Sequence, residues 1–398
     1  MTKLSSIADY VTNKISSNDI ALREYVTTDC ILQNKKGREI ATNLPPQSCC
    51  LTRYQHGDVL IANIRPYLKK VWFADIDGGA SSDVLVFRVK EGHSPSFLYA
   101  VLLQDSFFDY VMQGAKGSKM PRGDKEQILR YEMPTLSCSE ESIGTFFLNL
   151  DKKIRLNEQI NQNLEAMAKQ LYDYWFVQFD FPNEEGKPYK SSGGEMLWND
   201  KLKRNIPVGW HCGNLFEIAV FTNGLACQKF RPKDDEMPLP VIKIREMHDG
   251  ISVDTEEVTS NIPESVKVYN GDVLFSWSAS LEVMLWAYGL GGLNQHIFKV
   301  TSANDFPKSF YYFQLLDYVN VFKKMAEARK TTMGHITQDH LQQSTIAIPD
   351  NKDIADKFEE LISPIFKQIV KLQEEISNLI KQRDELLPLL MNGQITIE

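Results

Sequence analysis

The feature that most constrains this sequence is an internal repeat, in which the second half follows the first with an offset of about 214 residues. The segment Gly-Asp-Val-Leu at 57–60 returns at 271–274, and the pattern Phe-x-Tyr-x-x-Leu-Leu that begins at Phe97 returns at Phe310. Two weaker matches keep the same order: Leu4 and Ile7 with Leu215 and Ile218, and Met133-Pro134 with Ile348-Pro349. Several matches in one order, with offsets that drift by only a few residues, indicate a duplicated module.

Each copy of the module is followed by a long segment in which apolar residues alternate in steps of four and three. The first alternation runs from Ile143 to Trp175, and the second runs from Phe358 to Leu390, 215 residues later. An alternation sustained over more than four heptads is typical of paired helices. The sequence therefore predicts two long helices, at about residues 139–177 and 353–388, that form a coiled coil with each other.

Polar residues interrupt the apolar seam of both predicted helices. Asn157, Asn161 and Arg383 occupy seam positions, and the simplest interpretation is that they fix the register of the pair. Pro364 lies inside the second pattern. Because proline removes a helical hydrogen bond and crowds the preceding turn, it predicts either a kink or a helix start close to that position.

These features predict an α+β fold of two mixed α/β modules in a pseudo-two-fold repeat, separated by a long antiparallel two-helix coiled coil. A helix with some 33 residues in its seam pattern is about 50 Å long and cannot bury its apolar stripe alone. A parallel pair would bring both modules to one end, whereas an antiparallel pair holds them apart. The predicted domains are 1–137 (first module), 138–180 (first helix), 181–204 (a linker rich in Gly, Pro, Ser and charge), 205–349 (second module) and 350–398 (second helix).

Composition narrows the class of protein. The first residues contain no apolar core of a signal peptide, and no run of about 18 apolar residues predicts a membrane span, so we expect a cytoplasmic location. The six cysteines form no C-x-x-C pair, which predicts free thiols, and the scattered histidines predict no metal site. The net charge of −8 disfavours a DNA-binding surface spread over the whole chain. Residues 1–137 nevertheless carry 17 Lys and Arg against 15 Asp and Glu, so any such face must be local or assisted by a partner.

Three segments carry a family resemblance. The family is that of the specificity subunits of type I restriction–modification systems. Its central region resembles residues 148–180, and the entry to its second recognition domain resembles the Ile-Pro-Val-Gly-Trp at 206–210. Its distal region resembles residues 379–395, with Arg-Asp-x-Leu-Leu-Pro at 383–388. The resemblance covers essentially the full length. It implies a subunit without catalysis of its own, whose two target-recognition domains each recognise one half of a split, asymmetric target in double-stranded DNA.

The same resemblance implies partners and cofactors. The chain is expected to bind two methyltransferase subunits and, in the restriction complex, two motor-nuclease subunits. S-adenosylmethionine, ATP and Mg²⁺ are expected on those partners, and no cofactor is expected on this chain. The implied reaction is N6-methylation of an adenine in each half of the target, with the helices acting as a spacer ruler between the two recognition domains.

Candidate DNA-contacting residues come from clusters that mix cations with groups able to contact phosphates or base edges. The first module offers two segments: Asn63, Arg65, Tyr67, Lys69 and Lys70, followed by Lys116, Lys119, Arg122 and Lys125. The second module offers Lys323, Lys324, Arg329, Lys330 and His335. The repeat also matches the first cluster to residues 276–282, which are not basic. We therefore expect the two modules to contact DNA unequally.

Each predicted helix ends in a bulky apolar cluster. The two clusters are Tyr174, Trp175 and Phe176 in the first helix, and Leu386, Leu387 and Leu390 in the second. They allow two interpretations, namely packing inside this chain or docking of the methyltransferase subunits.

Two other classes of function compete with the specificity subunit: a coiled-coil scaffold without a DNA role, and a self-contained modification enzyme. The enzyme is disfavoured because its motifs are missing. The only Gly-Lys pair, at 186–187, precedes a proline and forms no phosphate-binding loop. The only Pro-Pro pair lies in Leu-Pro-Pro-Gln at 44–47, which is not an amino-methyltransferase tetrad.

Overall fold

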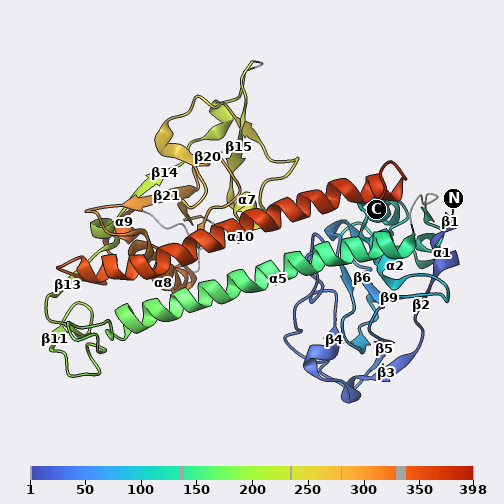
Figure 1. The fold of residues 1–398 in the computed structure, drawn as a ribbon, viewed down its shortest axis with the longest axis horizontal. Helices are drawn as coiled ribbons and strands as arrows, with labels where there is room; N and C mark the ends of the chain where they lie inside the picture. Colours follow the sequence, from blue (N-terminus) through green and yellow to red (C-terminus); the bar gives the residue numbers. More distant parts are fainter. Residues whose placement is uncertain (1, 134–138, 234, 279, 329–337, 398) are drawn as a thin grey trace. The chain divides into compact units, whose positions relative to one another are not determined.

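The computed structural model describes residues 2–133, 139–233, 235–278, 280–328 and 338–397. The chain forms two compact units (Figure 1). Unit 1 comprises Met1–Leu156 and Asn378–Glu398, and unit 2 comprises Asn157–Ser377. Each unit thus combines one predicted module with parts of both long helices, while the predicted domain limits, which follow the chain, remain a prediction.

Unit 1 is a layered α+β module. Its elements in chain order are β1 (Thr2–Lys3), α1 (Leu4–Ile7), β2 (Ala8–Tyr10), β3 (Lys14–Ser16), β4 (Tyr25–Val26), β5 (Cys50–Tyr54), β6 (Val59–Ala62), β7 (Val71–Phe73), β8 (Gly78–Ala80), β9 (Val84–Val89), α2 (Pro95–Leu103), α3 (Asp105–Gln113), α4 (Lys125–Ile128) and β10 (Glu132–Met133). One sheet has the order β2-β9-β6-β7 and a second has the order β3-β5-β8-β4, while β1 pairs with β10. These strands pair antiparallel except β4 with β8.

Unit 2 repeats this plan. Its elements are β11 (Met196–Asn199), β12 (Arg204–Pro207), β13 (Trp210–Gly213), α6 (Leu215–Ile218), β14 (Ala219–Asn223), β15 (Leu239–Ile242), α7 (Ile244–Asp249), β16 (Glu257–Val258), β17 (Lys267–Val268), β18 (Val273–Ser276), β19 (Glu282–Leu285), β20 (Gly291–Leu293), β21 (Ile297–Ser302), α8 (Lys308–Ala328), α9 (Gln338–Gln342) and β22 (Ile346–Pro349). The sheet β14-β21-β18-β19 repeats the order of β2-β9-β6-β7, and β13 with β22 repeats β1 with β10. The duplication predicted from the sequence is therefore confirmed at the level of strand order.

Alternation along the strands builds two cores in each module. In β6, Val59 and Ile61 face the helix side, where α2 packs, and Leu60 faces the second sheet. In β18, Val273 and Phe275 face the helix side, and Leu274 faces the other core. Because successive side chains point to opposite faces of a strand, a short apolar run with both faces covered is the expected pattern.

The repeated Gly-Asp-Val-Leu forms the turn that enters β6 in one module and β18 in the other. Gly57 and Gly271 adopt φ angles of 89° and 87°, a left-handed conformation that costs glycine little. The aspartate that follows each glycine accepts a hydrogen bond from the backbone N–H three residues earlier, at 2.8 Å for both Asp58 and Asp272. The motif is thus a structural turn with a capping carboxylate.

Each of these aspartates also holds a cation on the neighbouring central strand. Arg88 donates two hydrogen bonds to Asp58, from Nε at 2.8 Å and from Nη2 at 2.7 Å. Lys299 lies 2.8 Å from Asp272. The side chain of Asp58 is 2% exposed and that of Asp272 is 24% exposed, so the pair in the first module is the more deeply buried.

A glycine pair at the centre of the second sheet is another shared feature. A Cβ on Gly79 would lie 2.9 Å from the Leu51 side chain, and a Cβ on Gly292 would lie 2.6 Å from Val258. Both distances are too short for a real contact, so side chains at these positions would push the packed layer away. Glycines at 78–79 and 291–292 therefore allow the close packing of both second sheets.

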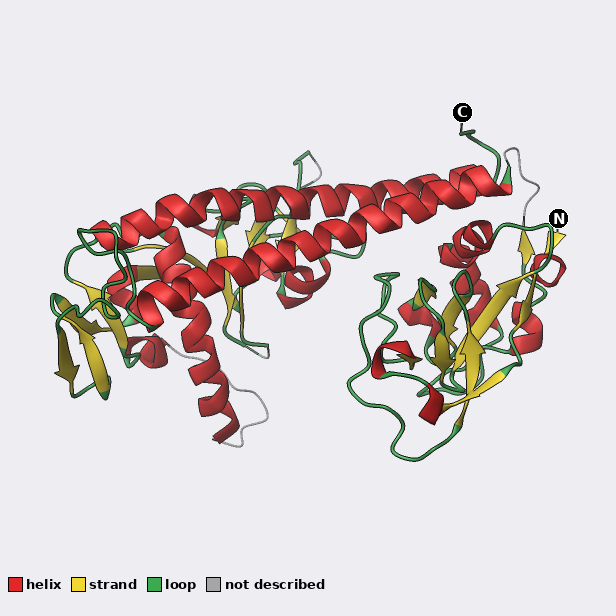
Figure 2. Cartoon of the chain, turned by 60° about the horizontal axis from the view of Figure 1, so that its bottom comes forward, coloured by secondary structure: helices red, strands yellow, loops and turns green. Residues whose placement is uncertain are grey.

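The predicted long helices are α5 (Glu140–Tyr172), extended by a π-helical turn (Asp173–Val177), and α10 (Asp353–Met391). They run antiparallel within each unit, which confirms that part of the predicted fold (Figures 1 and 2). In unit 1 the start of α5 shares a core with the end of α10 through Phe147 and Leu390. In unit 2 the end of α5 packs on the start of α10, where the Trp175 and Phe358 rings lie 5.5 Å apart.

The polar seam residues are buried as predicted. Asn157, Asn161 and Arg383 are 6%, 6% and 3% exposed. Asn161 donates from Nδ2 to the Ile369 carbonyl at 3.3 Å, a bond that only one register of the two helices allows. Pro364 lies inside α10, which begins at Asp353, so of the two alternatives for this proline, a kink or a nearby helix start, the helix start is excluded.

The segment 181–204 contains more structure than its composition suggested. Strand β11 pairs with β12 in a hairpin, and Phe181 stacks between Tyr189 and Trp210, with ring centroids 4.8 and 5.7 Å away. Aromatic packing, which composition alone does not reveal, folds this connection against the second module.

A histidine joins the two ends of the second module. His211 in β13 lies 2.5 Å from Asp350, which follows β22, and 3.3 Å from Glu217 in α6. Partial burial alone would lower the pKa of His211, but hydrogen bonds with Asp350 and Glu217 raise it above the ordinary value.

Candidate nucleic-acid interface

The two basic segments predicted in the first module meet at the edge where β6 ends. The Arg65 N–H donates to the Pro121 carbonyl at 2.8 Å, and the Gly123 N–H donates to the Asn63 carbonyl at 3.2 Å. Arg122 also exchanges two backbone hydrogen bonds of 2.9 Å with Lys116. Segments 63–70 and 116–125 are thus joined into one surface by their backbones, although some fifty residues separate them in the sequence.

Most of the predicted side chains on this surface are exposed. They are Arg65, Tyr67, Lys116, Lys119, Arg122 and Lys125. Two of the cations have an acidic neighbour: Arg122 lies 3.1 Å from Asp83, and Lys116 lies 3.0 Å from Asp124. Exposed pairs of this kind are weak and can be exchanged for phosphate at little cost. We call these six residues the basic edge.

Lys69 and Lys70 are placed differently from the basic edge. The Lys70 ammonium donates to the Thr28 carbonyl at 2.6 Å, and Lys69 lies 2.9 Å from Asp105. Both residues are partly buried. The structure therefore gives them roles inside the module, and Asn63 is likewise partly buried beneath the edge. Their contact with DNA stays a prediction.

The basic residues predicted in the second module are only partly covered by the structure. Lys323 and Lys324 are exposed in the C-terminal half of α8. Arg329, Lys330 and His335 lie outside the described residues.

The sheet edge of the second module that corresponds to the basic edge carries different chemistry. The backbone N–H of Trp277 donates to the His296 carbonyl at 3.3 Å, and the backbone N–H of Asn63 donates in the same way to the Asp83 carbonyl at 2.9 Å. Trp277 therefore takes the place of Asn63 in the repeat. The repeat already placed Trp277 in the matching segment 276–282, but a search for basic residues does not select it.

Aromatic and amide groups surround Trp277. Its Nε1 donates to Asn223 Oδ1 at 3.2 Å, and its ring lies 5.6 Å from the ring of His296. Asn223 and His296 are exposed, while Gln295 is partly exposed next to them. These four residues come from the ends or beginnings of three neighbouring strands, β14, β18 and β21. We call them the amide edge.

The apolar clusters at the helix ends lie largely inside their own units. Trp175 and Phe176 are 6% and 2% exposed, and Leu387 and Leu390 are 1% and 2% exposed. Leu386 is partly buried against the same core as its neighbours. Packing inside the chain therefore accounts for these residues, and they are not free to dock a subunit. Tyr174, 37% exposed, is the member of the predicted set that remains open to a partner.

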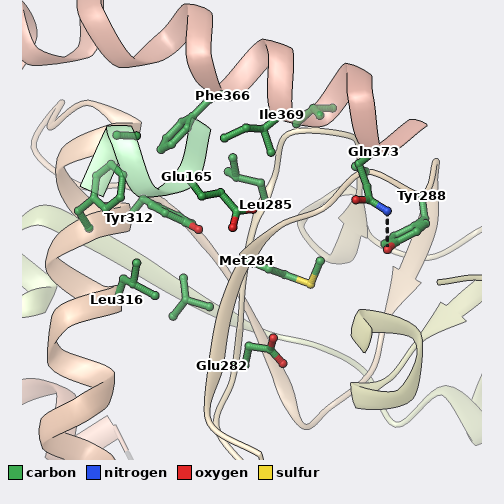
Figure 3. Close-up of a pocket in the computed structure, with 15 residues that line it drawn as sticks. Glu165, Glu282, Met284, Leu285, Tyr288, Tyr312, Leu316, Phe366, Ile369 and Gln373 are labelled. Atoms are coloured by element: carbon green, nitrogen blue, oxygen red, sulfur yellow. Dashed lines mark hydrogen bonds between the residues drawn. The ribbon is translucent and has the colours of Figure 1, made fainter. Parts of the chain in front are cut away.

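Unit 2 also contains a cavity of about 310 Å³ between β19, α8 and the two long helices (Figure 3). Its lining includes the carboxylates of Glu165 and Glu282 and the rings of Tyr312 and Phe366. Burial raises the pKa of Glu165. Burial raises the pKa of Tyr312 as well, followed in effect by the charges of Glu165 and Glu282. An acidic lining repels phosphate, so the cavity does not extend the DNA-contacting surface.

Comparison with known proteins shows what this chain resembles. Residues 207–382 match the family described as the type I restriction modification DNA specificity domain. The chain is 23% identical to the type I restriction enzyme MjaIX specificity subunit of Methanocaldococcus jannaschii, over 96% of this chain and 87% of that protein. It is also 23% identical to the HindI specificity subunit of Haemophilus influenzae, over 98% of both.

The fold has a counterpart among solved structures. The crystal structure of the type I restriction–modification S subunit from M. genitalium matches all of this chain and 96% of that one, with a TM-score of 0.59 and 12% identity. This likeness supports the α+β fold with a duplicated module.

The duplicated fold and the matched domain define a DNA-specificity class of protein. Within that class, residues 207–382 match the type I restriction modification DNA specificity domain, and the resemblance of the whole chain to type I specificity subunits is confirmed. Members of this family are generally non-catalytic. None of the helices in the described part of the chain combines the length and apolar character needed to cross a bilayer.

Proposed function

We propose that this chain selects the DNA sequence for a type I restriction–modification complex, with each module recognising one half of a split target. The observation that carries the proposal is the repeated strand-end edge. The same position in two copies of one fold presents a basic edge in unit 1 and an amide edge in unit 2. Two copies with different side chains suit an asymmetric target, whereas identical edges would suit a symmetric one.

The two edges suit different contacts. Guanidinium groups such as Arg122 bind phosphates or the O6 and N7 atoms of guanine, while amides such as Asn223 and Gln295 match the N6 and N7 atoms of adenine. The indole of Trp277 offers an apolar face to a thymine methyl or an unstacked base. The module with the basic edge therefore supplies more of the salt-dependent affinity, and the module with the amide edge depends more on partner subunits.

The proposed complex contains further subunits. Two methyltransferase subunits bind this chain and carry S-adenosylmethionine, and two motor-nuclease subunits carry ATP and Mg²⁺ when restriction takes place. This chain contributes no catalytic group and binds no cofactor of its own. The complex works in the cytoplasm, where its DNA substrate lies.

The test is to co-express the chain with the methyltransferase encoded beside it and to map N6-methyladenine across the host genome by single-molecule sequencing. The proposal predicts one split, asymmetric motif that disappears when this chain is omitted. Methylation without this chain, or methyl transfer by the purified chain alone, would overturn it. A stable complex that methylates no motif would favour the scaffold interpretation.

A further inference from the structure

Left-handed backbone conformations in unit 1 gather within the basic edge and in the residues bonded to it. Four non-glycine residues adopt left-handed φ angles there: Asn34 (56°), Lys35 (60°), Arg65 (53°) and Lys69 (49°). This conformation costs about 1–2 kcal/mol for an ordinary residue and persists only where neighbouring contacts hold it. The turn from Arg65 to Lys69 therefore needs contacts that hold it in place.

Backbone hydrogen bonds join the two strained turns. The Asn34 N–H donates to the Leu68 carbonyl at 2.9 Å, and the Lys35 N–H donates to the Lys69 carbonyl at 3.0 Å. On its other side, the turn is joined to Pro121 through Arg65. The turn that presents Arg65 and Tyr67 is thus held between residues 34–35 and residues 121–123.

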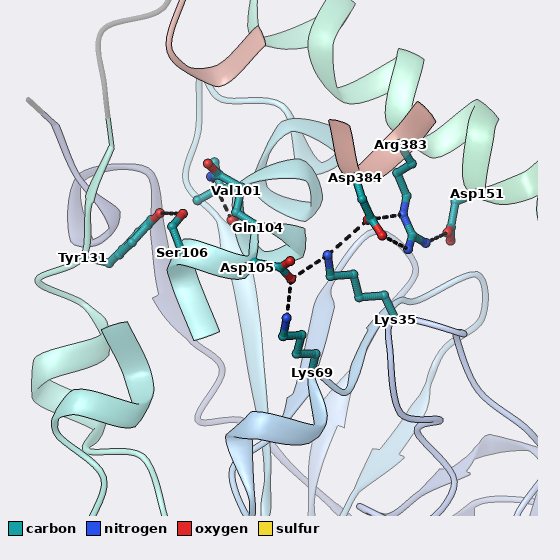
Figure 4. A network of polar contacts seen from close by, with 10 residues as sticks. All are labelled: Lys35, Lys69, Val101, Gln104, Asp105, Ser106, Tyr131, Asp151, Arg383 and Asp384. Atoms are coloured by element: carbon teal, nitrogen blue, oxygen red, sulfur yellow. Dashed lines mark hydrogen bonds and ion pairs between the residues drawn. The ribbon is translucent and has the colours of Figure 1, made fainter. Parts of the chain in front are cut away.

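A chain of ion pairs continues from these turns to the end of α10 (Figure 4). Lys35, whose side chain is 5% exposed, lies 2.8 Å from Asp105 and 3.2 Å from Asp384. Lys69 lies 2.9 Å from the same oxygen of Asp105. Burial alone would raise the pKa of Asp105, but hydrogen bonds from Lys35 and Lys69 lower it below the ordinary value.

The helix end of this chain of ion pairs is fixed in turn. Arg383 donates from Nε to Asp384 at 3.0 Å and from Nη1 to Asp151 of α5 at 3.4 Å. Asp151, whose side chain is 4% exposed, also accepts a hydrogen bond from the Tyr99 hydroxyl at 2.8 Å. The Arg-Asp pair of the distal helix therefore connects the buried seam of the two helices to the strained turn.

The described residues of the second module show a different connection, a direct ion pair. Asp317 of α8, which follows the repeated Leu-Leu as Gln104 does in the first module, pairs directly with Lys169 of α5 at 2.9 Å. Among the described contacts of Lys169 and Asp317, no lysine from a loop bridges α5 and the module. Within the described parts of the chain, ion pairs that run from a long helix through loop lysines to a strained turn are thus found in the first module.

We propose that Asp384 is a positioning residue for the basic edge: through Lys35, Asp105 and Lys69, the end of α10 holds the Arg65–Lys69 turn in its DNA-recognising conformation. The inference rests on the proposed function of the basic edge. Removing the charge of Asp384 leaves Lys35 with one carboxylate instead of two, and the turn gains alternative conformations. Recognition of the first half of the target then loosens, while recognition of the second half is unchanged.

The test compares Asp384→Asn with Glu385→Gln in the complex with the methyltransferase. Glu385 is a matched control because it is the next residue of the same helix, loses the same charge, and pairs with exposed Lys381 among the described residues. Genome-wide mapping of N6-methyladenine should show at least a tenfold rise in methylation at sites that deviate in the first half for Asp384→Asn. The second half should stay as selective as in the unmodified chain, and Glu385→Gln should change neither half.

A second variant and a second measurement separate positioning from loss of stability. Lys35→Met should loosen the same half, and the double variant should be no looser than either single variant because both break one relay. Hydrogen exchange in the unmodified complex and in Asp384→Asn should differ at the amides of Asn34 and Lys35. Equal loosening of both halves, or unchanged selectivity, would overturn the inference. Absence of any motif with the unmodified chain would instead overturn the proposed function.

Discussion

Replacing Asp58 by asparagine should destabilise the first module far more than the matched change at Asp272 destabilises the second. Asp58→Asn keeps the shape of the side chain but loses the charge that holds the Arg88 guanidinium through two hydrogen bonds. Breaking a fully buried ion pair costs about 3–5 kcal/mol. Arg88 is 33% exposed and can recover water, so we expect about 2–3 kcal/mol here.

The matched change, Asp272→Asn, should cost about 1 kcal/mol or less. Asp272 forms one ion-pair contact with Lys299 and is itself 24% exposed. Lys299 also keeps other partners, since its ammonium donates to the Lys267 carbonyl at 2.8 Å and lies 5.6 Å from the Tyr269 ring.

Native-state hydrogen exchange followed by mass spectrometry measures each module separately. Exchange in peptides from β6 and β9 should accelerate about 30- to 150-fold in Asp58→Asn, because 1.4 kcal/mol corresponds to a factor of ten. Peptides from β18 and β21 should accelerate less than about tenfold in Asp272→Asn. Equal effects of the two changes, or a larger effect at Asp272, would refute the argument from burial.

Three further predictions concern stability, docking and spacing. The pKa of His211 is raised in the folded state, so its contribution to stability is complete below the unfolded pKa of about 6.5 and is lost as pH rises through the folded pKa. The free energy of unfolding of His211→Asn, measured by denaturation, should therefore converge on that of the unmodified chain in alkaline solution. Leu387→Ala should lower the free energy of unfolding by about 2–5 kcal/mol because the side chain is buried. Tyr174→Ala should change the free energy of unfolding little but should weaken methyltransferase binding, as measured by calorimetry. The reverse pattern would contradict the packing assigned to the helix ends. Inserting one heptad after Leu156 and one after Ser377, at the boundary of the two units, should lengthen the spacer between the half-sites. Methylation maps should show the longer spacer with both half-sites unchanged. A spacer of unchanged length would contradict the role of the helices as a spacer ruler.

The sequence predicted the features of this fold that are local or periodic. The heptads gave α5 to within one residue of its start and α10 at Asp353, because an apolar stripe repeats along the helix itself. The repeated Gly-Asp-Val-Leu identified equivalent turns because the turn is local: its glycine takes the left-handed conformation, and its aspartate accepts a hydrogen bond from the backbone three residues earlier. Pro364 was misleading as a possible helix start because the turns on both sides of it pack well enough to continue the helix.

The site was harder to predict because its contacts link distant parts of the chain. Basic composition identified segments 63–70 and 116–125, but their joining depends on backbone hydrogen bonds that no sequence pattern encodes. Lys35 was missed because its partner Asp384 lies 349 residues away. The repeat identified the segment of Trp277, but the residue was not selected because a search for positive charge does not detect recognition through amide and aromatic groups.

The central claim is that each module recognises its own half of one DNA target, and paired edge variants test it most directly. Lys119→Ala with Arg122→Ala removes two exposed cations from the basic edge, and Asn223→Ala with Gln295→Ala removes two amides from the amide edge. Genome-wide maps of N6-methyladenine, made with the methyltransferase and each variant, should show one half of the motif becoming degenerate in the first variant and the other half in the second. Relaxation of the same half in both variants, or of neither half, would contradict the account.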